Sequence, residues 1–381
     1  MFRILALLQL TRAALAFTAI ADAWAVLLLR APGEPPQAKW VLILQMLVVA
    51  VASFGLYAFG MALNDLLDAR RDRLFAPRRP IPSGRIQPRW AVVTALLLLM
   101  AALLATVFMP ILRFWNTGDL HTGDFIPYSF LFALATAGLI VFYDATSKYL
   151  GGVGLVTLGA IRALHCLIGN PKTPLLFLSM ILLTHVIVVS TVAYRLENKR
   201  PRLKGRDIWA VVLGLVVGNG LALWYMEMRG VLVWGNFRML IGPGIAGLAY
   251  IGWAGMVLGS SKRSPKQKGE RLMLMGLFWL FVYDASMLVS NEQYLAGVAI
   301  TLLLVCAILS FFGIRLLSRT MLRPKVGYRV ERVGAGTPFN GSAGPGTAGD
   351  GGSGTGSGAR GGTSGPTAAE PGALPGLPPT T

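Results

Sequence analysis

The sequence contains few cysteines, few histidines and few acidic residues. Among its 381 residues are two cysteines, three histidines and 17 aspartates and glutamates, against 35 lysines and arginines. Cys166 and Cys306 both fall inside long apolar stretches, which favours packing in a core and excludes a disulfide framework or a cysteine metal site. Charged residues make up only 14% of the chain, too few for the surface of an ordinary soluble protein of this length.

Apolar residues are abundant instead. They make up 54% of the chain, and the mean hydropathy is +0.61, which together predict an all-α polytopic membrane protein. A helix of about 17–25 apolar residues crosses the hydrocarbon core of a bilayer. The stretches that are long enough predict about nine to ten spans: Arg12–Leu29, Trp40–Leu63, Trp90–Leu112, Pro127–Tyr143, Gly151–Ile168, Pro174–Ala193, Ile208–Met228, Met239–Leu258, Leu272–Leu288 and Tyr294–Ile314.

Lysines and arginines crowd alternate loops of this predicted topology. They gather in segments 70–89, 199–206, 262–268 and 315–325. By the positive-inside rule these segments are cytoplasmic, and both termini then lie on the cytoplasmic side of the cell inner membrane. The net charge of +18 therefore indicates membrane topology and gives no reason to expect nucleic-acid binding.

The chain divides by composition into two parts. Residues 1–332 read as one transmembrane domain, with no soluble module large enough to form a second core. Residues 333–381 are rich in glycine, proline, serine and threonine, and such a segment cannot bury enough apolar surface to offset its ordering entropy. We expect it to be a disordered cytoplasmic tail, and we infer no obligate protein partner.

Several of the few acids gather where the second predicted span ends. The run Asn64-Asp65-Leu66-Leu67-Asp68-Ala69-Arg70-Arg71-Asp72 places Asn64, Asp68 and Asp72 at i, i+4 and i+8, close to one helix face. Like charges at this spacing repel, so a divalent cation between them is the best explanation. Mg²⁺ held by a few side-chain oxygens shares its remaining positions with water and phosphate, which indicates a diphosphate substrate. The alternative is a solvated helix end whose acids pair with neighbouring arginines.

This run and the segment that follows carry a resemblance to a known family. The run Asn-Asp-x-x-Asp-x-x-x-Asp from Asn64 to Asp72, followed by Arg79-Pro80-Ile81-Pro82-Ser83-Gly84, resembles the first signature of the UbiA superfamily of intramembrane prenyltransferases. The likeness runs from about Leu10 to about Ile314 and includes Leu10-Thr11-Arg12. It implies a UbiA-like helix bundle around a lipid-accessible cavity, where Mg²⁺ on two Asp-rich motifs binds an isoprenyl diphosphate. The prenyl group then passes to an aromatic or related lipophilic acceptor.

A second segment resembles the family at the end of the fourth predicted span. Tyr143-Asp144-Ala145-Thr146-Ser147-Lys148 is similar to a Tyr-x-x-x-Lys motif, although its spacing is one residue longer. Lys148 would contact diphosphate oxygens and Tyr143 would donate a hydroxyl; the alternative is an interfacial anchor. Arg162, inside the fifth predicted span, could reach the diphosphate, or could pair with Asp22 or Asp284.

The second Asp-rich motif of the family has only one acidic residue in this chain. Its place holds Tyr194-Arg195-Leu196-Glu197-Asn198-Lys199-Arg200, where only Glu197 and Asn198 offer oxygen ligands and nearby cations could replace a metal ion. This departure resembles the EboC-like branch of the superfamily.

The resemblance implies a set of roles for these residues. Catalytic roles fall to Asp65, Asp68, Asp72, Tyr143 and Lys148. Mg²⁺ ligands would be Asn64, Asp65, Asp68, Asp72 and Glu197. Substrate contacts would come from Asn64, Arg78, Arg79, Lys148, Arg162, Tyr194, Arg195, Glu197 and Asn198.

The function implied is Mg²⁺-dependent transfer of an isoprenyl group, within the bilayer, from a polyprenyl diphosphate to a lipophilic acceptor. Two alternatives stay open. The first is a non-catalytic protein of the same fold that binds or carries a lipid, which the thin second motif favours. The second is an ion-coupled transporter that uses Asp22, Arg162, His185 and Asp284 as charges at the membrane midplane.

Overall fold

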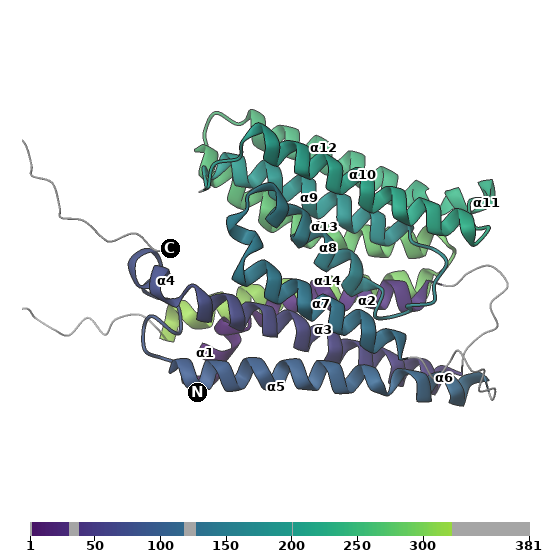
Figure 1. Ribbon diagram of the computed structural model, residues 1–381, viewed down its shortest axis with the longest axis horizontal. Helices are drawn as coiled ribbons and strands as arrows, with labels where there is room; N and C mark the ends of the chain where they lie inside the picture. Colours follow the sequence, from purple (N-terminus) through teal and green to yellow (C-terminus); the bar gives the residue numbers. More distant parts are fainter. Residues whose placement is uncertain (1, 30–37, 118–126, 200, 322–381) are drawn as a thin grey trace, which may run out of the picture. The chain divides into compact units, whose positions relative to one another are not determined.

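The computed structural model describes residues 2–29, 38–117, 127–199 and 201–321, and throughout these ranges the regular elements are helices (Figure 1). The predicted tail, 333–381, lies outside them. The helices are α1 (Phe2–Leu10), α2 (Ala13–Leu28), α3 (Lys39–Leu67), α4 (Ala69–Phe75), α5 (Pro88–Val107), α6 (Met109–Thr117), α7 (Tyr128–Ala145), η2 (Ser147–Tyr149), α8 (Gly152–Cys166), α9 (Phe177–Leu196), α10 (Gly205–Met228), α11 (Trp234–Phe237), η3 (Arg238–Leu240), α12 (Ile241–Gly259), α13 (Pro265–Ser290) and α14 (Tyr294–Met321).

Each predicted span coincides with an apolar helix of the bundle. Eight helices in the described residues are long and apolar enough to cross a membrane, and the shorter apolar helices α2 and α8 fill the first and fifth predicted positions. The chain is therefore an integral, multi-pass membrane protein, and the all-α prediction is confirmed.

Inner and outer helices differ in how far they are buried. In its most apolar window α9 is 56% buried, whereas α10 is only 6% buried, as expected for a helix that faces lipid. Small residues allow the inner helices to approach closely. At Gly55 of α3, for example, a Cβ atom would lie 2.7 Å from the carbonyl oxygen of Leu98 on α5.

The middle of the bundle contains buried charges from three helices. Asp22 of α2 forms an ion pair with Arg162 of α8, and Asp284 of α13 interacts with Asp22 through its side chain. Both carboxylates are fully buried, and Arg162 is 9% exposed. The sequence left either a diphosphate or a carboxylate as the partner of Arg162, and in the structure the partner is the carboxylate of Asp22.

Two further interior residues have simple structural settings. Nε2 of His185 lies 3.1 Å from the carbonyl oxygen of Gly276, and its ring meets the edges of Tyr250 and Tyr283. Cys166 is buried, as predicted. Cys306 is exposed on α14, so the prediction that it packs in the core is wrong: α14 turns this part of its surface outward, away from the other helices.

Candidate diphosphate site

The Asp-rich run spans a break between two helices. α3 ends at Leu67 and α4 begins at Ala69, with Asp68 between them. The backbone hydrogen bonds nevertheless keep the i→i−4 pattern, because Asp68 N–H donates to Asn64 O at 2.9 Å and Asp72 N–H donates to Asp68 O at 2.8 Å. The helical spacing predicted for these side chains is therefore largely kept.

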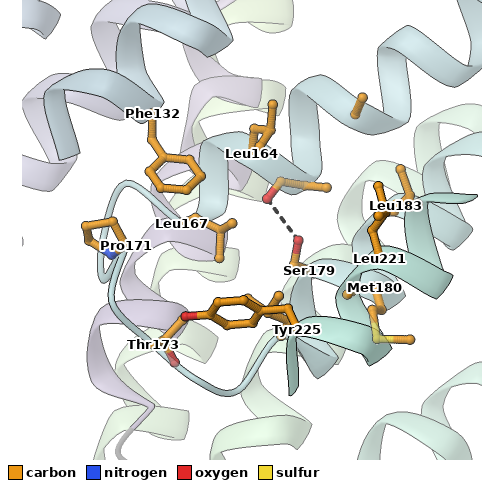
Figure 2. Close-up of a pocket in the computed structure, with 15 residues that line it drawn as sticks. Phe132, Leu164, Leu167, Pro171, Thr173, Ser179, Met180, Leu183, Leu221 and Tyr225 are labelled. Atoms are coloured by element: carbon orange, nitrogen blue, oxygen red, sulfur yellow. Dashed lines mark hydrogen bonds between the residues drawn. The ribbon is translucent and has the colours of Figure 1, made fainter. Parts of the chain in front are cut away.

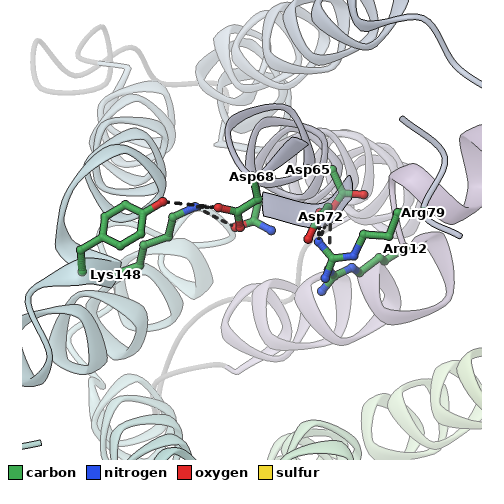
Figure 3. Close-up of polar contacts among 8 residues, drawn as sticks. Arg12, Asp65, Asp68, Asp72, Arg79 and Lys148 are labelled. Atoms are coloured by element: carbon green, nitrogen blue, oxygen red, sulfur yellow. Dashed lines mark hydrogen bonds and ion pairs between the residues drawn. The ribbon is translucent and has the colours of Figure 1, made fainter. Parts of the chain in front are cut away.

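The side chains of the run divide into two groups, each in contact with a basic side chain (Figure 3). In the first group, Nη1 of Arg79 lies 3.2 Å from Oδ1 of Asp65 and 2.6 Å from Oδ2 of Asp72. Arg12, in the turn before α2, adds a guanidinium nitrogen 3.7 Å from the same Asp65 oxygen. Asp65 and Asp72 are both buried, so their charges are neutralised chiefly by arginines.

In the second group, an ammonium nitrogen joins the two remaining members of the run. Nζ of Lys148 lies 3.0 Å from Oδ1 of Asp68 and 3.3 Å from Oδ1 of Asn64. The Tyr149 hydroxyl donates to the same Asp68 oxygen at 3.4 Å. Lys148 is separated from Asn64 by 84 residues, so the structure brings the two family-like segments together.

The loop that carries Arg79 is tied down by Arg85. Nη1 of Arg85 donates to Oε1 of Gln9 at 2.6 Å, and Nη2 of Arg85 donates to the Arg78 carbonyl at 2.5 Å. Partial burial lowers the pKa of Arg85, which starts so high that the group stays cationic. Arg78, a predicted substrate contact, is itself exposed. Of the neighbouring residues Arg78 and Arg79, Arg79 is the one that contacts Asp65 and Asp72.

Glycines hold the loop that carries Lys148. Gly151 has φ +57°, a conformation that favours glycine, and Gly152 N–H donates to Oδ1 of Asp207 at 3.3 Å. A Cβ atom on Gly152 would overlap the backbone carbonyl of Asp207 at the start of α10.

We expect Gly152→Ala to lower thermal stability by about 1–3 kcal/mol, because it overpacks this contact, and to lower activity by displacing Lys148. The measurement is a melting curve beside an activity assay. Gly220→Ala on α10 is the matched control, because a Cβ atom added there would enter open space, with no neighbour within 4 Å. Equal stability for the two variants would contradict the tight contact.

Asp144 is a site residue that the sequence reasoning missed. It is 3% exposed at the end of α7, and its charge interacts with those of Lys148, Asp68 and Arg12. Its neighbour Tyr143 interacts electrostatically with Asp144, Asp68 and Tyr194. The sequence could have indicated Asp144, because it is an acid at the end of an apolar span. Arg12 could be recognised only as part of the family-like segment Leu10-Thr11-Arg12.

The end of α9 does not supply a second acidic group to this site. Glu197, a predicted metal ligand, forms an ion pair with Lys199 at 2.9 Å and packs against Gly269 of α13. The Tyr194 hydroxyl donates to the Pro201 carbonyl at 2.8 Å, while Arg195 and Asn198 are exposed. Across the described residues, no three histidine, cysteine or acidic side chains are placed to hold one metal ion.

The oxygens of the run therefore form two pairs, each around a basic nitrogen, and the predicted set of metal ligands stays a prediction. The pairs form because long basic side chains from other segments reach between the acids. Such a pair still suits Mg²⁺, which proteins bind through one or two carboxylates together with water and phosphate oxygens.

An apolar pocket of about 490 Å³ lies among the neighbouring helices (Figure 2). Its walls come from α7, α8, α9 and α10, with Phe132, Leu167 and Tyr225 among the lining residues. Ser179 in this wall donates to the Ala163 carbonyl at 3.0 Å. The pocket suits an apolar chain, and its residues are far along the helices from Lys148.

Comparison with known proteins supports the likeness found in the motifs. No family model matches the sequence. The chain is 30% identical over 129 residues to the digeranylgeranylglyceryl phosphate synthase of Sulfurisphaera tokodaii. This alignment covers 34% of this chain and 39% of that protein. It is 25% identical over 264 residues to the protein of the same name from Haloquadratum walsbyi, covering 63% of this chain and 80% of that protein.

A solved structure described as digeranylgeranylglyceryl phosphate synthase in membranes matches this bundle with a TM-score of 0.51. The match covers 76% of this chain and 99% of that one, at 19% identity, and shows a shared fold. The chain is therefore similar to these synthases in part of its sequence and in its fold. The chain spans 39% of the length of the Sulfurisphaera protein and 52% of the length of the protein of the same name from Saccharolobus solfataricus. The place of this chain in the EboC-like branch stays a prediction.

Proposed function

We propose that this protein transfers an isoprenyl group from an isoprenyl diphosphate to a lipophilic acceptor within the membrane, with Mg²⁺ as cofactor. The observation that carries the proposal is the meeting of Asn64 and Asp68 with Lys148 beside the Arg79 group, at one end of a UbiA-type bundle. Acidic oxygens and basic donors side by side are what a metal-bound diphosphate requires.

The chain's own residues would bind and orient the diphosphate. Lys148, Arg79 and Arg12 offer N–H donors to its oxygens, while Asp65 and Asp72 hold the Arg79 guanidinium in place. Asn64 and Asp68 would hold Mg²⁺, which supplies stabilisation of the charge that grows on the departing diphosphate. Transfer breaks the bond from prenyl carbon to diphosphate oxygen, forms a bond to the acceptor and releases one acceptor proton.

The acceptor class is open to direct test. The sequence resemblance favours an aromatic acceptor. The name of the relatives, digeranylgeranylglyceryl phosphate synthase, points instead to a glyceryl phosphate lipid as acceptor, which would react through a hydroxyl group. We propose a lipophilic acceptor and include both classes in the assay below.

Diphosphate release by the purified full chain in lipid tests the function. A panel of isoprenyl diphosphates is offered with Mg²⁺ or EDTA, and with an aromatic acceptor, a glyceryl phosphate lipid or a membrane lipid extract. We expect diphosphate release to require both Mg²⁺ and an acceptor. In oriented vesicles, isoprenyl diphosphate supplied on the cytoplasmic side alone should be enough for release. Tight binding of the diphosphates without release for any acceptor would instead support the carrier alternative.

A further inference from the structure

The apolar pocket lies on the face of α8 that turns away from the buried charges of the bundle. Its lining residues Ala160, Ala163 and Leu164 stand at i, i+3 and i+4 and therefore share one helix face. Arg162 lies on the opposite face of α8, where it pairs with α2. The outer wall belongs to α10, which is only 6% buried, and its lining residue Leu221 is 59% exposed. The pocket therefore opens toward the surface that faces lipid.

Tight helix contacts close the pocket toward the candidate diphosphate site on the α10 side. Lys148 lies just before the start of α8, and the pocket begins further along that helix. Between them, a Cβ atom on Gly214 of α10 would lie 2.5 Å from a side-chain carbon of Val156. At the edge of the pocket, a Cβ atom on Gly218 would lie 2.6 Å from a side-chain carbon of Leu183. The two sites are therefore separate along this helix pair.

The interior of the pocket suits a hydrocarbon chain. The Ser179 hydroxyl donates to the Ala163 carbonyl at 3.0 Å, and the Thr173 hydroxyl oxygen accepts from Leu175 N–H at 3.2 Å. These two hydroxyl groups of the wall therefore already have backbone partners, and most of the other lining residues are apolar. The volume of about 490 Å³ falls within the range of about 300–1,000 Å³ that is usual for small-ligand pockets.

Two exposed basic side chains lie at the rim of the pocket. Lys172 stands between the lining residues Pro171 and Thr173, in the connection from α8 to α9. Arg229 follows the lining residue Tyr225 by four positions, and its guanidinium carbon lies 6.0 Å from the centre of the Tyr225 ring. Residues four apart share a helix face, so Arg229 lies on the pocket side of α10. Both cations are at helix ends far along α8 and α10 from the candidate diphosphate site.

The rim has the character of a membrane interface with a positive charge. Trp224, beside Tyr225, is 63% exposed, as is typical of tryptophan at the level of lipid headgroups. Glu227 lies two residues from Arg229, and residues two apart do not share a helix face. Ammonium and guanidinium groups form charge-assisted hydrogen bonds with phosphate oxygens, and basic groups beside a gap between membrane helices can bind anionic headgroups.

We propose that this pocket binds one anionic phospholipid. An acyl chain would lie among the lining residues of α8, α9 and α10 that Figure 2 shows, and Lys172 and Arg229 would contact the headgroup phosphate. The lipid would fill the space between the outer helix α10 and the two inner helices, and so hold them together. The site is separate from that of prenyl transfer, so this inference does not depend on the proposed function.

Native mass spectrometry of the full chain counts bound lipids directly. The protein is purified in mild detergent and offered phosphatidylglycerol, which is anionic, or phosphatidylcholine, which has no net charge, with the same acyl chains. We expect one phosphatidylglycerol for each chain, bound at least about tenfold more tightly than phosphatidylcholine, because two basic groups attract the net negative charge.

A variant that fills the pocket tests where the acyl chain lies. Ala222→Phe places a large ring among the lining residues of α10 and should abolish binding of the lipid. The matched control is Val216→Phe on the same helix, because Val216 is 64% exposed and lies outside the lining of the pocket. Size-exclusion elution and a melting curve identify any variant that does not fold.

A charge variant tests the role of the rim. Lys172→Gln combined with Arg229→Gln should remove the preference for phosphatidylglycerol and leave the weaker binding of phosphatidylcholine. The control, Lys262→Gln combined with Lys266→Gln, removes two exposed cations near the start of α13 and should keep the preference. Both double variants change the net charge by the same amount.

Several results would overturn the inference. Equal affinity of the wild type for the two lipids would show that the rim does not select an anionic headgroup. Equal lipid binding by folded Ala222→Phe and Val216→Phe would show that the acyl chain lies elsewhere. Displacement of phosphatidylglycerol by geranylgeraniol, an uncharged isoprenyl alcohol, would assign the pocket to an isoprenyl chain instead. All three results would leave the prenyltransferase proposal standing, because diphosphate release is measured separately.

Discussion

Replacing Asp68 with asparagine is expected to lower prenyl transfer at least about 10³-fold. The substitution keeps the shape of the side chain and removes the charge that both Lys148 and a metal ion need. Metal stabilisation of a developing charge is worth several kcal/mol, and each 1.36 kcal/mol changes a rate tenfold. The measurement is single-turnover diphosphate release with saturating Mg²⁺, isoprenyl diphosphate and acceptor.

The control for this prediction is Glu227→Gln, an exposed acid at the end of α10, which should turn over like the wild type. Asp72→Asn makes an informative comparison, because Asp72 contacts Arg79 and would act only through that arginine. We expect its loss to be smaller than that of Asp68→Asn. A correctly inserted Asp68→Asn protein with a rate within tenfold of the wild type would refute the assignment of Asp68.

The second large effect concerns stability at the middle of the bundle. Arg162→Met is expected to destabilise the fold by about 3–5 kcal/mol, because it leaves the buried Asp22 and Asp284 without their cation. The measurement is the free energy of unfolding in mixed micelles with increasing denaturant. The double variant Asp22→Asn with Arg162→Met should recover part of the loss, since it removes one of the unpaired charges.

This experiment also decides between the two roles that the sequence left open for Arg162. A structural partner of Asp22 loses stability when it is removed, and the affinity of the remaining folded protein for diphosphate stays near the wild-type value. If Arg162→Met is as stable as the wild type but binds diphosphate much more weakly, Arg162 contacts the substrate as the sequence resemblance implied.

Much of the architecture could be read from local properties of the chain. Span length, apolar content and basic loops act over about 20 residues or fewer, so residue order alone is enough to place the spans. The acidic run could also be recognised locally, because acids at the end of a membrane helix are costly without a function. The likeness of Lys148 to a family motif placed it in the same site.

The pairing of charges could not be read in this way, because it depends on which helices pack together. Arg79 returns to Asp65 and Asp72 only through the fold of its loop, and that return divides the predicted cage. Glu197 stands where the sequence resemblance implies an acidic motif, and the structure packs it against α13 and pairs it with Lys199. Neither outcome has a signature in residue spacing.

The sequence by itself determined that this is a helical membrane protein with an acidic site at the end of α3, because burial of apolar length and the cost of membrane charges are properties of single segments. Only the tertiary structure decided which acid meets which base. Asp144 joined the site, and Arg162 was paired with Asp22, because contacts between segments far apart in the chain exist only after the helices have packed.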